Sequence, residues 1–247
     1  MRPGILRTLY RALYPRAHRV ICQSDAMAHE MQDKIRVSSA AVAILPNPVD
    51  EGSIHCTIET SPSHWPSSGC NILAISRLAP EKGIDILLRA FAQIQMDFPA
   101  SRLVILGKGP QEAALKELCA KLDLGDSVEF AGHVDNPSVY FPGAGLFALS
   151  SRHEGIPNAL LEAAVAGLPI VATPASQGLV QLIGSSPGVW LAANSSPQAI
   201  ARALRDALSK HGSVQKYVHN WIPPLFLQNA ISADQQVIDT VVLEESR

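Results

Sequence analysis

The chain of 247 residues has no strong charge of either sign and no cysteine pattern. Its 20 Lys and Arg residues nearly balance its 22 Asp and Glu residues, for a net charge of −2. The overall charge therefore gives no reason to expect nucleic acid as a partner. The four cysteines, at positions 22, 56, 70 and 119, are scattered without the paired spacing of a metal site. This pattern predicts reduced thiols in a cytoplasmic protein and no metal.

Long apolar runs are also missing, since none approaches the ~20 residues that a membrane span needs. Arginines interrupt the N-terminal residues too often for the apolar core of a signal peptide. A basic helix that touches anionic lipid is one interpretation of this segment, and an ordinary exposed helix face is the favoured one. The residues in question are Arg2, Ile5, Leu6, Arg7, Leu9, Arg11, Leu13, Arg16 and Arg19. We expect a cytoplasmic protein, with a peripheral contact with the inner face of the membrane left open.

The middle of the chain alternates short apolar runs with helical patterns. Continuous apolar runs predict buried strands at 71–76, 102–106, 127–131, 146–150 and 169–173. Helical patterns cover 84–98, 111–122 and the residues after Pro157. Strands of this kind, separated by helices, predict a doubly wound parallel α/β domain over residues 70–224. Such a domain binds ligands beyond the carboxyl ends of its strands.

The residues on either side of this domain have a different character. Residues 1–50 contain strand patterns at 19–22 and 41–45 and a helix pattern at 26–34 that Ser24 can cap. Because so few elements cannot bury a core alone, we expect a remnant of an N-terminal domain whose beginning is absent. Residues 51–69, rich in Ser, Pro and Thr, predict a linker or surface loop. A helix at 225–247 is expected to pack back on the N-terminal segment.

Two carboxylates flank a predicted helix start in the sequence EGIPNALLE at 154–162. Glu154 falls in the loop before the helix, Pro157 suits the first helical position, and Glu162 lies about a turn and a half inside. Backbone N–H groups at the positive end of a helix attract anions and electron-rich ligands. The pattern favours a polyhydroxylated, phosphorylated ligand. The alternative is a helix start with one surface acid and one acid paired to a neighbour.

A second candidate is the sequence RLAPEKG at 77–83, which follows the first strand of the α/β domain. Arg77 offers a two-pronged donor and Lys82 a mobile point charge, a combination that suits a diphosphate. A solvated loop with surface ion pairs is an equal alternative for this pair alone. Both candidates follow strands of one sheet, and their joint occurrence favours a ligand site.

Six segments in order carry a resemblance to a known family: 76–78, 81–83, 104–110, 128–134, 151–163 and 167–172. They resemble the donor-binding half of the family-4 glycosyltransferases of the GT-B fold, also called group 1 glycosyltransferases. The resemblance runs from about residue 17 to the C-terminus and is strongest over 72–183. Glu154 and Glu162 match the two acids of the family's E-x7-E motif.

The resemblance implies a role for each candidate residue. Arg77 and Lys82 would hold the nucleotide diphosphate and stabilise the leaving group, and Glu154 would accept hydrogen bonds from the donor sugar, which makes these three the catalytic set. Glu162 would bind the ribose, and the backbone around Val134 would meet the base. Backbone N–H groups from 155 to 158 would contact the sugar and the distal phosphate; these residues are Gly155, Ile156, Pro157 and Asn158.

The activity that the resemblance implies is a retaining, hexosyltransferase-type glycosyltransferase. The donor would be a nucleotide-sugar of the UDP or GDP type, and no metal or cofactor is expected. The acceptor would be a glycan or a lipid-linked molecule of lipopolysaccharide or cell-envelope polysaccharide biosynthesis. The alternative is a nucleotide-sugar-binding subunit or inactive fragment, whose acceptor domain comes from a partner chain.

Several positions depart from the family pattern or suggest other chemistry. Gln181 stands where the family usually has a glutamate, and Gly145 where an aspartate is common. Gly107 and Gly109 suggest a dinucleotide fingerprint, but no third glycine follows, which disfavours a nicotinamide-dependent oxidoreductase. His153 could serve as a catalytic base, although a loop histidine that lines the groove is the favoured interpretation.

Overall fold

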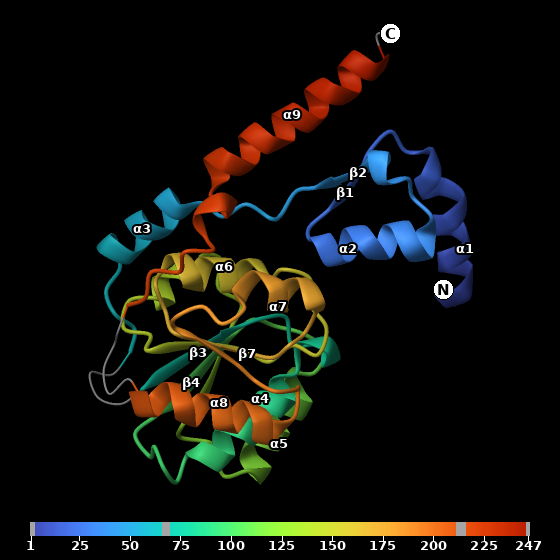
Figure 1. Cartoon of the computed structure of the whole chain (residues 1–247). Coiled ribbons are helices and arrows are strands. Elements are labelled where there is room, and N and C mark those ends of the chain that lie inside the picture. Colours follow the sequence, from blue (N-terminus) through green and yellow to red (C-terminus); the bar gives the residue numbers. More distant parts are fainter. Residues whose placement is uncertain (1–2, 66–69, 211–215, 246–247) are drawn as a thin grey trace. The chain divides into compact units, whose positions relative to one another are not determined.

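The computed structural model describes residues 3–65, 70–210 and 216–245 (Figure 1). The chain divides into two compact units. The larger unit is Asp50–Ile222, and the smaller one combines Met1–Val49 with Pro223–Arg247. All candidate site residues belong to the larger unit.

A six-stranded parallel sheet forms the centre of the larger unit, with strand order β5-β4-β3-β6-β7-β8. Every neighbouring pair is parallel. The strands are β3 (Asn71–Ile75), β4 (Arg102–Leu106), β5 (Val128–Gly132), β6 (Leu146–Leu149), β7 (Ile170–Ala172) and β8 (Val189–Leu191). The predicted doubly wound parallel sheet is confirmed, with β8 as an additional strand at its edge. Strand order reverses between β3 and β6, the place where such sheets bind ligands.

Helices cover both faces of this sheet (Figure 1). One face carries α4 (Ile84–Ile94), α5 (Glu112–Lys121) and α8 (Pro197–Lys210), and the other carries α6 (Asn158–Val165) and α7 (Gln177–Ile183). The helix predicted over 84–98 forms α4, and its Leu87, Leu88, Phe91 and Ile94 are fully buried. Burial of a continuous apolar stripe fixes this helix against the sheet, and its first turn then begins at the carboxyl end of β3.

Residues 51–60 form the helix α3 (Glu51–Thr60), so the prediction of a linker or loop over 51–69 is wrong there. The Asp50 side chain accepts a hydrogen bond from the backbone N–H of Ser53 at 3.0 Å, which caps the helix, and Ile54 is buried. The Ser and Thr content suggested a loop, whereas the cap and the buried apolar residue favour the helix. Trp65 is also buried, and its indole N–H donates to the carbonyl of Tyr140 at 2.7 Å. Residues 66–69 of this predicted loop lie outside the described residues.

The smaller unit contains a two-stranded parallel sheet of β1 (Val20–Cys22) and β2 (Val42–Ile44). The predicted cap at Ser24 is confirmed, because its hydroxyl accepts the N–H of Met27 at the start of α2 (Asp25–Glu30). The backbone of Val49 pairs with Leu225 and Leu227, just before and at the start of α9 (Leu227–Glu245).

The predicted basic N-terminal segment forms helix α1 (Pro3–Leu13). Leu9 and Leu13 are exposed on it, while Tyr10 packs against the small core of this unit. Arg2, and the side chains of Ile5, Leu6 and Arg7, lie outside the described part of the chain. Among the described residues, no helix combines the length and the apolar character that crossing a membrane requires.

Candidate functional site

The loops after β3 and β6 meet at the point where strand order reverses, and they bring Lys82 to Glu154. The Lys82 amino group lies 2.5 Å from a carboxylate oxygen of Glu154, and the side chains are only 19% and 14% exposed. The sequence placed the two residues 72 positions apart. Because the pair is largely shielded from water, each charge is balanced mainly by the other.

Glu154 is also held by a chain of hydroxyl groups. The Ser151 hydroxyl donates to the same carboxylate oxygen at 3.0 Å. The Ser151 carbonyl in turn accepts from the Thr173 hydroxyl at 2.5 Å, and Thr173 is fully buried at the end of β7. These contacts tie the orientation of Glu154 to the sheet itself. Ser151 follows one predicted strand and Thr173 ends another, but no sequence signal linked either residue to Glu154.

Arg77 makes a different contact from the one expected. Its guanidinium lies 2.5 Å from the Glu81 carboxylate, and 67% of the Arg77 side chain is exposed. The backbone N–H of Glu81 lowers the pKa of the Glu81 carboxyl, and the charge of Arg77 lowers that pKa further. This geometry is the surface ion pair of the alternative interpretation. An exposed pair contributes little to stability, so Arg77 can leave it readily.

A glycine allows the two site loops to approach each other. Gly83 adopts a left-handed backbone conformation with φ of 62°. A Cβ atom at this position would lie 2.1 Å from the carbonyl oxygen of Ser150. The Ser150 hydroxyl also donates to the carbonyl of Lys82 at 3.0 Å. The close backbone approach holds the Lys82 loop against the loop that carries Glu154.

The start of helix α6 differs from the sequence prediction in one detail. Pro157 has extended backbone angles and precedes the helix, which begins at Asn158. The prediction that Pro157 is the first helical residue is therefore wrong by one position. Proline also has no N–H group, so within 155–158 only Gly155, Ile156 and Asn158 can donate from the backbone.

Glu162 lies inside α6 and is half-buried. Burial raises the pKa of its carboxyl above the ordinary value. Within the described residues it has no ion-pair partner. Burying a charged group without a partner costs free energy, so a half-buried carboxyl of this kind suits a ligand group that can hydrogen-bond to it, such as a hydroxyl.

The remaining candidates lie on other loops of the same unit. Val134 is half-buried in the loop that follows β5, at the same edge of the sheet as the other strand ends. His153 is exposed and lines a pocket of about 360 Å³ with Pro80, Glu81, Asp85, Gln111 and Arg152. Neither Glu154 nor Glu162 lines that pocket.

Two further contacts of the site had no counterpart in the sequence analysis. Arg152 forms an ion pair with Asp85 on α4. Ser176 caps the unpredicted helix α7 by accepting the N–H of Leu179 at 3.1 Å, and its hydroxyl donates to the Gly155 carbonyl at 3.3 Å. A serine just before an apolar helical run is the signal that could have revealed α7.

The two positions that depart from the family pattern differ in their packing. Gln181 is exposed on α7. The backbone N–H of Gly145 donates to the Asn71 carbonyl at 2.8 Å. A Cβ atom at Gly145 would lie 3.3 Å from the Cys70 sulfur, so a larger side chain requires a local shift.

With this geometry, the comparison with known proteins identifies the family. Residues 62–222 match the model for glycosyl transferases group 1, and residues 1–52 match the model for glycosyltransferase family 4. The first match covers well over half of the chain, and the chain belongs to the group 1 glycosyltransferases.

Curated relatives agree with this assignment. An uncharacterized glycosyltransferase of Haemophilus influenzae is 33% identical over 133 residues, which are 54% of this chain and 38% of the relative. The putative colanic acid biosynthesis glycosyltransferase WcaL of Escherichia coli is 30% identical over 209 residues, covering 79% of this chain and 48% of WcaL. The chain thus spans less than half the length of these relatives.

Solved structures show the same fold at low sequence identity. A glycosyltransferase from Rickettsia africae aligns over 97% of this chain and 68% of its own, with a TM-score of 0.81 and 15% identity. Anabaena HepE, solved in complex with UDP and glucose, aligns over 98% of this chain and 67% of its own, with a TM-score of 0.79 and 19% identity. The larger unit is therefore the Rossmann-like half of a GT-B fold, as predicted.

Proposed function

We propose that the larger unit binds the donor of a retaining, hexosyltransferase-type glycosyltransferase, which moves a sugar from a nucleotide-diphosphate sugar to an acceptor. The observation that carries this proposal is the shielded Lys82–Glu154 pair at the carboxyl ends of β3 and β6. In a nucleotide-sugar the distal phosphate is bonded directly to the sugar. A cation beside an acid therefore matches a phosphate beside a hydroxyl-bearing ring.

In this proposal the ligand replaces the contacts that the charged residues make with each other. Lys82 turns from Glu154 to the diphosphate, and Glu154 accepts hydrogen bonds from sugar hydroxyls. Arg77 leaves its exposed pair with Glu81 to bind the same diphosphate. The exchange is favourable because the phosphate oxygens carry more charge than one carboxylate and accept several charge-assisted hydrogen bonds.

Other parts of the donor meet groups that lie along the same edge of the sheet. Glu162 binds the ribose hydroxyls, and the backbone around Val134 meets the base. The N–H groups of Gly155, Ile156 and Asn158 contact the sugar and the distal phosphate, at the positive end of α6.

Catalysis in this proposal rests on positioning and on stabilising the departing diphosphate. Arg77 and Lys82 balance the negative charge that develops as the bond to the sugar breaks. Glu154 holds the sugar so that the acceptor attacks from the side the diphosphate leaves, which retains the configuration. Neither a metal nor a cofactor takes part in this scheme, and the donor is of the UDP or GDP type.

The acceptor is proposed to be a glycan or a lipid-linked molecule. The names of two relatives support this choice. One is a putative colanic acid biosynthesis glycosyltransferase, and the other is a Campylobacter jejuni transferase whose name includes a diphospho-undecaprenol substrate. The second of these is 28% identical over 176 residues, which are 71% of this chain and 47% of the relative. A lipid-linked acceptor fits a cytoplasmic protein with a peripheral contact with the membrane.

Calorimetry with UDP, GDP and ADP tests the proposal. At least one should bind the wild-type chain, and both Lys82→Ala and Glu154→Gln should change its affinity, with a loss of about tenfold for the lysine variant because hydrogen bonds between charged groups are lost. Lys116→Ala is the control, since Lys116 forms an exposed pair within α5. A folded chain that binds none of the three nucleotides contradicts the proposal.

Turnover separates the enzyme from the alternative, a binding subunit or inactive fragment. Slow hydrolysis of UDP-sugars or GDP-sugars by the purified chain, monitored as nucleoside diphosphate release, supports a catalytic role. Nucleotide binding without any release of product supports a subunit that relies on a partner chain for the acceptor side.

A further inference from the structure

A second ion pair joins the two loops that hold Lys82 and Glu154. Arg152 follows β6, and Asp85 lies in the first turn of α4. The two terminal nitrogens of Arg152 lie 2.8 Å and 2.6 Å from the two carboxylate oxygens of Asp85. This is the two-pronged arrangement in which arginine binds a carboxylate most strongly and with a fixed orientation.

Arg152 also contacts the backbone of the facing loop. Its guanidinium donates to the Pro80 carbonyl at 2.7 Å, and its backbone N–H donates to the Glu81 carbonyl at 2.7 Å. Together with Asp85, one residue therefore fixes three points of the segment 80–85. Lys82 lies between these points, and Glu154 follows Arg152 by two residues.

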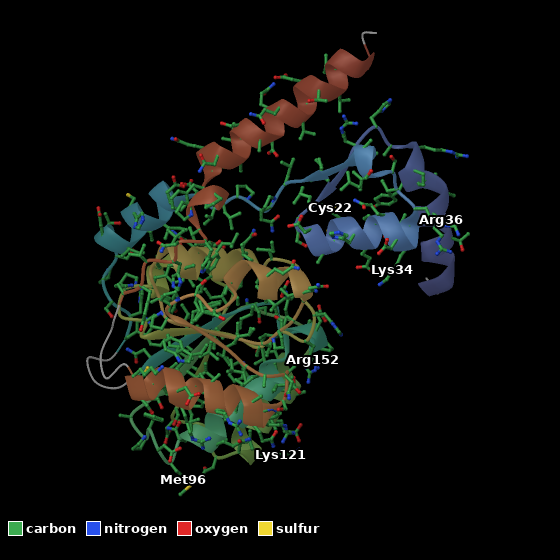
Figure 2. The ribbon with its side chains drawn as sticks, in the orientation of Figure 1. Cys22, Lys34, Arg36, Met96, Lys121 and Arg152 are labelled. Atoms are coloured by element: carbon green, nitrogen blue, oxygen red, sulfur yellow. The ribbon has the colours of Figure 1, made fainter. Side chains whose placement is uncertain are left out.

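The pair keeps its charge despite its partial burial. Burial opposes ionisation of Asp85, but the hydrogen bonds and the charge of Arg152 outweigh it and lower the pKa of the carboxyl. The Asp85 hydrogen bonds raise the pKa of Arg152 in turn. Both groups are thus ionised at neutral pH. Figure 2 shows Arg152 at the surface of the larger unit.

We propose that Arg152 and Asp85 form a positioning clamp that sets Lys82 against Glu154 and so tunes the affinity for the diphosphate and sugar of the donor. The clamp rests on the proposed function, and neither residue needs to touch the ligand. Its action is geometric, because a shift of about 1 Å at either loop moves Lys82 away from the place beside Glu154 where it meets the distal phosphate.

The chain offers a matched control at the other end of α4. Arg205 of α8 lies 2.6 Å from the carboxylate of Asp97 and also donates to the Gln93 carbonyl. Its exposure of 41% resembles the 37% of Arg152. This pair likewise ties two elements of the larger unit together, yet among the described residues its contacts include no candidate site residue.

The clamp acts on one part of the ligand, which gives a readout that a merely structural role would not move. Lys82 and Glu154 face the diphosphate and the sugar, whereas Glu162 on α6 faces the ribose and lies outside the clamp. Loss of Arg152 should therefore weaken the binding of nucleoside diphosphates much more than the binding of monophosphates. We expect Arg152→Ala to lower the affinity for the diphosphate about tenfold and the affinity for the monophosphate less than about twofold.

The test is calorimetry with UDP, GDP and ADP and with UMP, GMP and AMP, on variants whose folding is checked by thermal melts. Arg152→Lys should be intermediate, because it keeps the charge and loses the fork. In the double variant, Asp85→Ala should add little to the loss of affinity caused by Arg152→Ala, since both substitutions remove the same ion pair. Arg205→Ala should leave every affinity unchanged.

The outcomes separate the clamp from the proposed function. A wild-type chain that binds no nucleotide overturns the proposed function and the clamp with it. A wild-type chain that binds, together with Arg152 variants that match Arg205→Ala, overturns the clamp alone. Equal weakening of monophosphates and diphosphates in Arg152→Lys, which retains the charge and the fold, also overturns it.

Discussion

Replacing Gly83 by alanine should disrupt the site through the backbone alone. At 2.1 Å from the Ser150 carbonyl oxygen, the added Cβ lies about 0.9 Å inside the 3.0 Å below which such contacts hardly occur. The left-handed conformation, with φ of 62°, adds strain for any residue with a Cβ. The two loops must therefore separate or the backbone must change its conformation.

The expected loss of stability follows from these two effects. Left-handed strain for alanine is about 1–2 kcal/mol, and forcing an extra carbon into a packed place costs about 1–3 kcal/mol. We expect Gly83→Ala to lower the free energy of unfolding by about 2–5 kcal/mol. A displacement of nearly 1 Å should also separate Lys82 from Glu154 and weaken nucleotide binding by up to about a hundredfold.

Urea unfolding and calorimetry measure the two effects on one preparation. Gly125→Ala is the control, because no atom lies within 4 Å of a Cβ added there, and its effect should stay within about 0.5 kcal/mol. If Gly83→Ala matches the control in stability and in nucleotide affinity, the close approach of the loops is not what organises the site.

Three further perturbations test the fold and its charges. Burial raises the pKa of the Glu162 carboxyl, so its ionised form lowers the stability of the fold once pH rises above about 4.5. Glu162→Gln should therefore stabilise the protein at pH 7 but not below about pH 4.5. Unfolding midpoints that are the same for the variant and the wild type at both pH values would contradict this. Burial lowers the pKa of His219, whose ring nitrogen lies 2.8 Å from the Leu168 carbonyl oxygen, so stability should fall as pH drops below about 6.5, and His219→Gln should reduce that fall in urea titrations. Asp50→Ala should cost about 1 kcal/mol and reduce the helix signal in circular dichroism, whereas a loop at 51–60 would leave both unchanged.

The sheet was predictable because buried parallel strands leave a strong signal. Continuous apolar runs at 71–76 and 102–106 became β3 and β4 almost residue for residue. The edge strand β8 (Val189–Leu191) escaped prediction because its side chains are only half-buried and its run is three residues long. Helix α3 escaped because polar residues dominate its exposed side, and one cap and one buried isoleucine carry its signal.

The chemistry of the candidate site was visible in the sequence, but its pairing was not. The sequence placed Lys82 and Glu154 after strands of one sheet, without indicating that the strands are neighbours or that the two residues contact each other. The preference of Arg77 for Glu81 over any inward contact depends on side-chain rotamers, which spacing does not determine. Arg152 and Asp85 lie next to recognisable motifs, yet their contact depends on how two loops pack, which one sequence does not reveal.

The Arg77–Glu81 and Lys82–Glu154 pairs differ in how readily a ligand can open them. The Arg77–Glu81 pair is exposed, so water can replace either partner at little cost. The Lys82–Glu154 pair is shielded, and removing Lys82 to a phosphate leaves a partly buried carboxylate that needs new hydrogen bonds. A nucleoside diphosphate alone offers Glu154 nothing, whereas the hydroxyls of an attached sugar can satisfy it. In the proposed function, the resting pair therefore favours the complete donor over the diphosphate that remains after transfer, and this difference would assist release of the product.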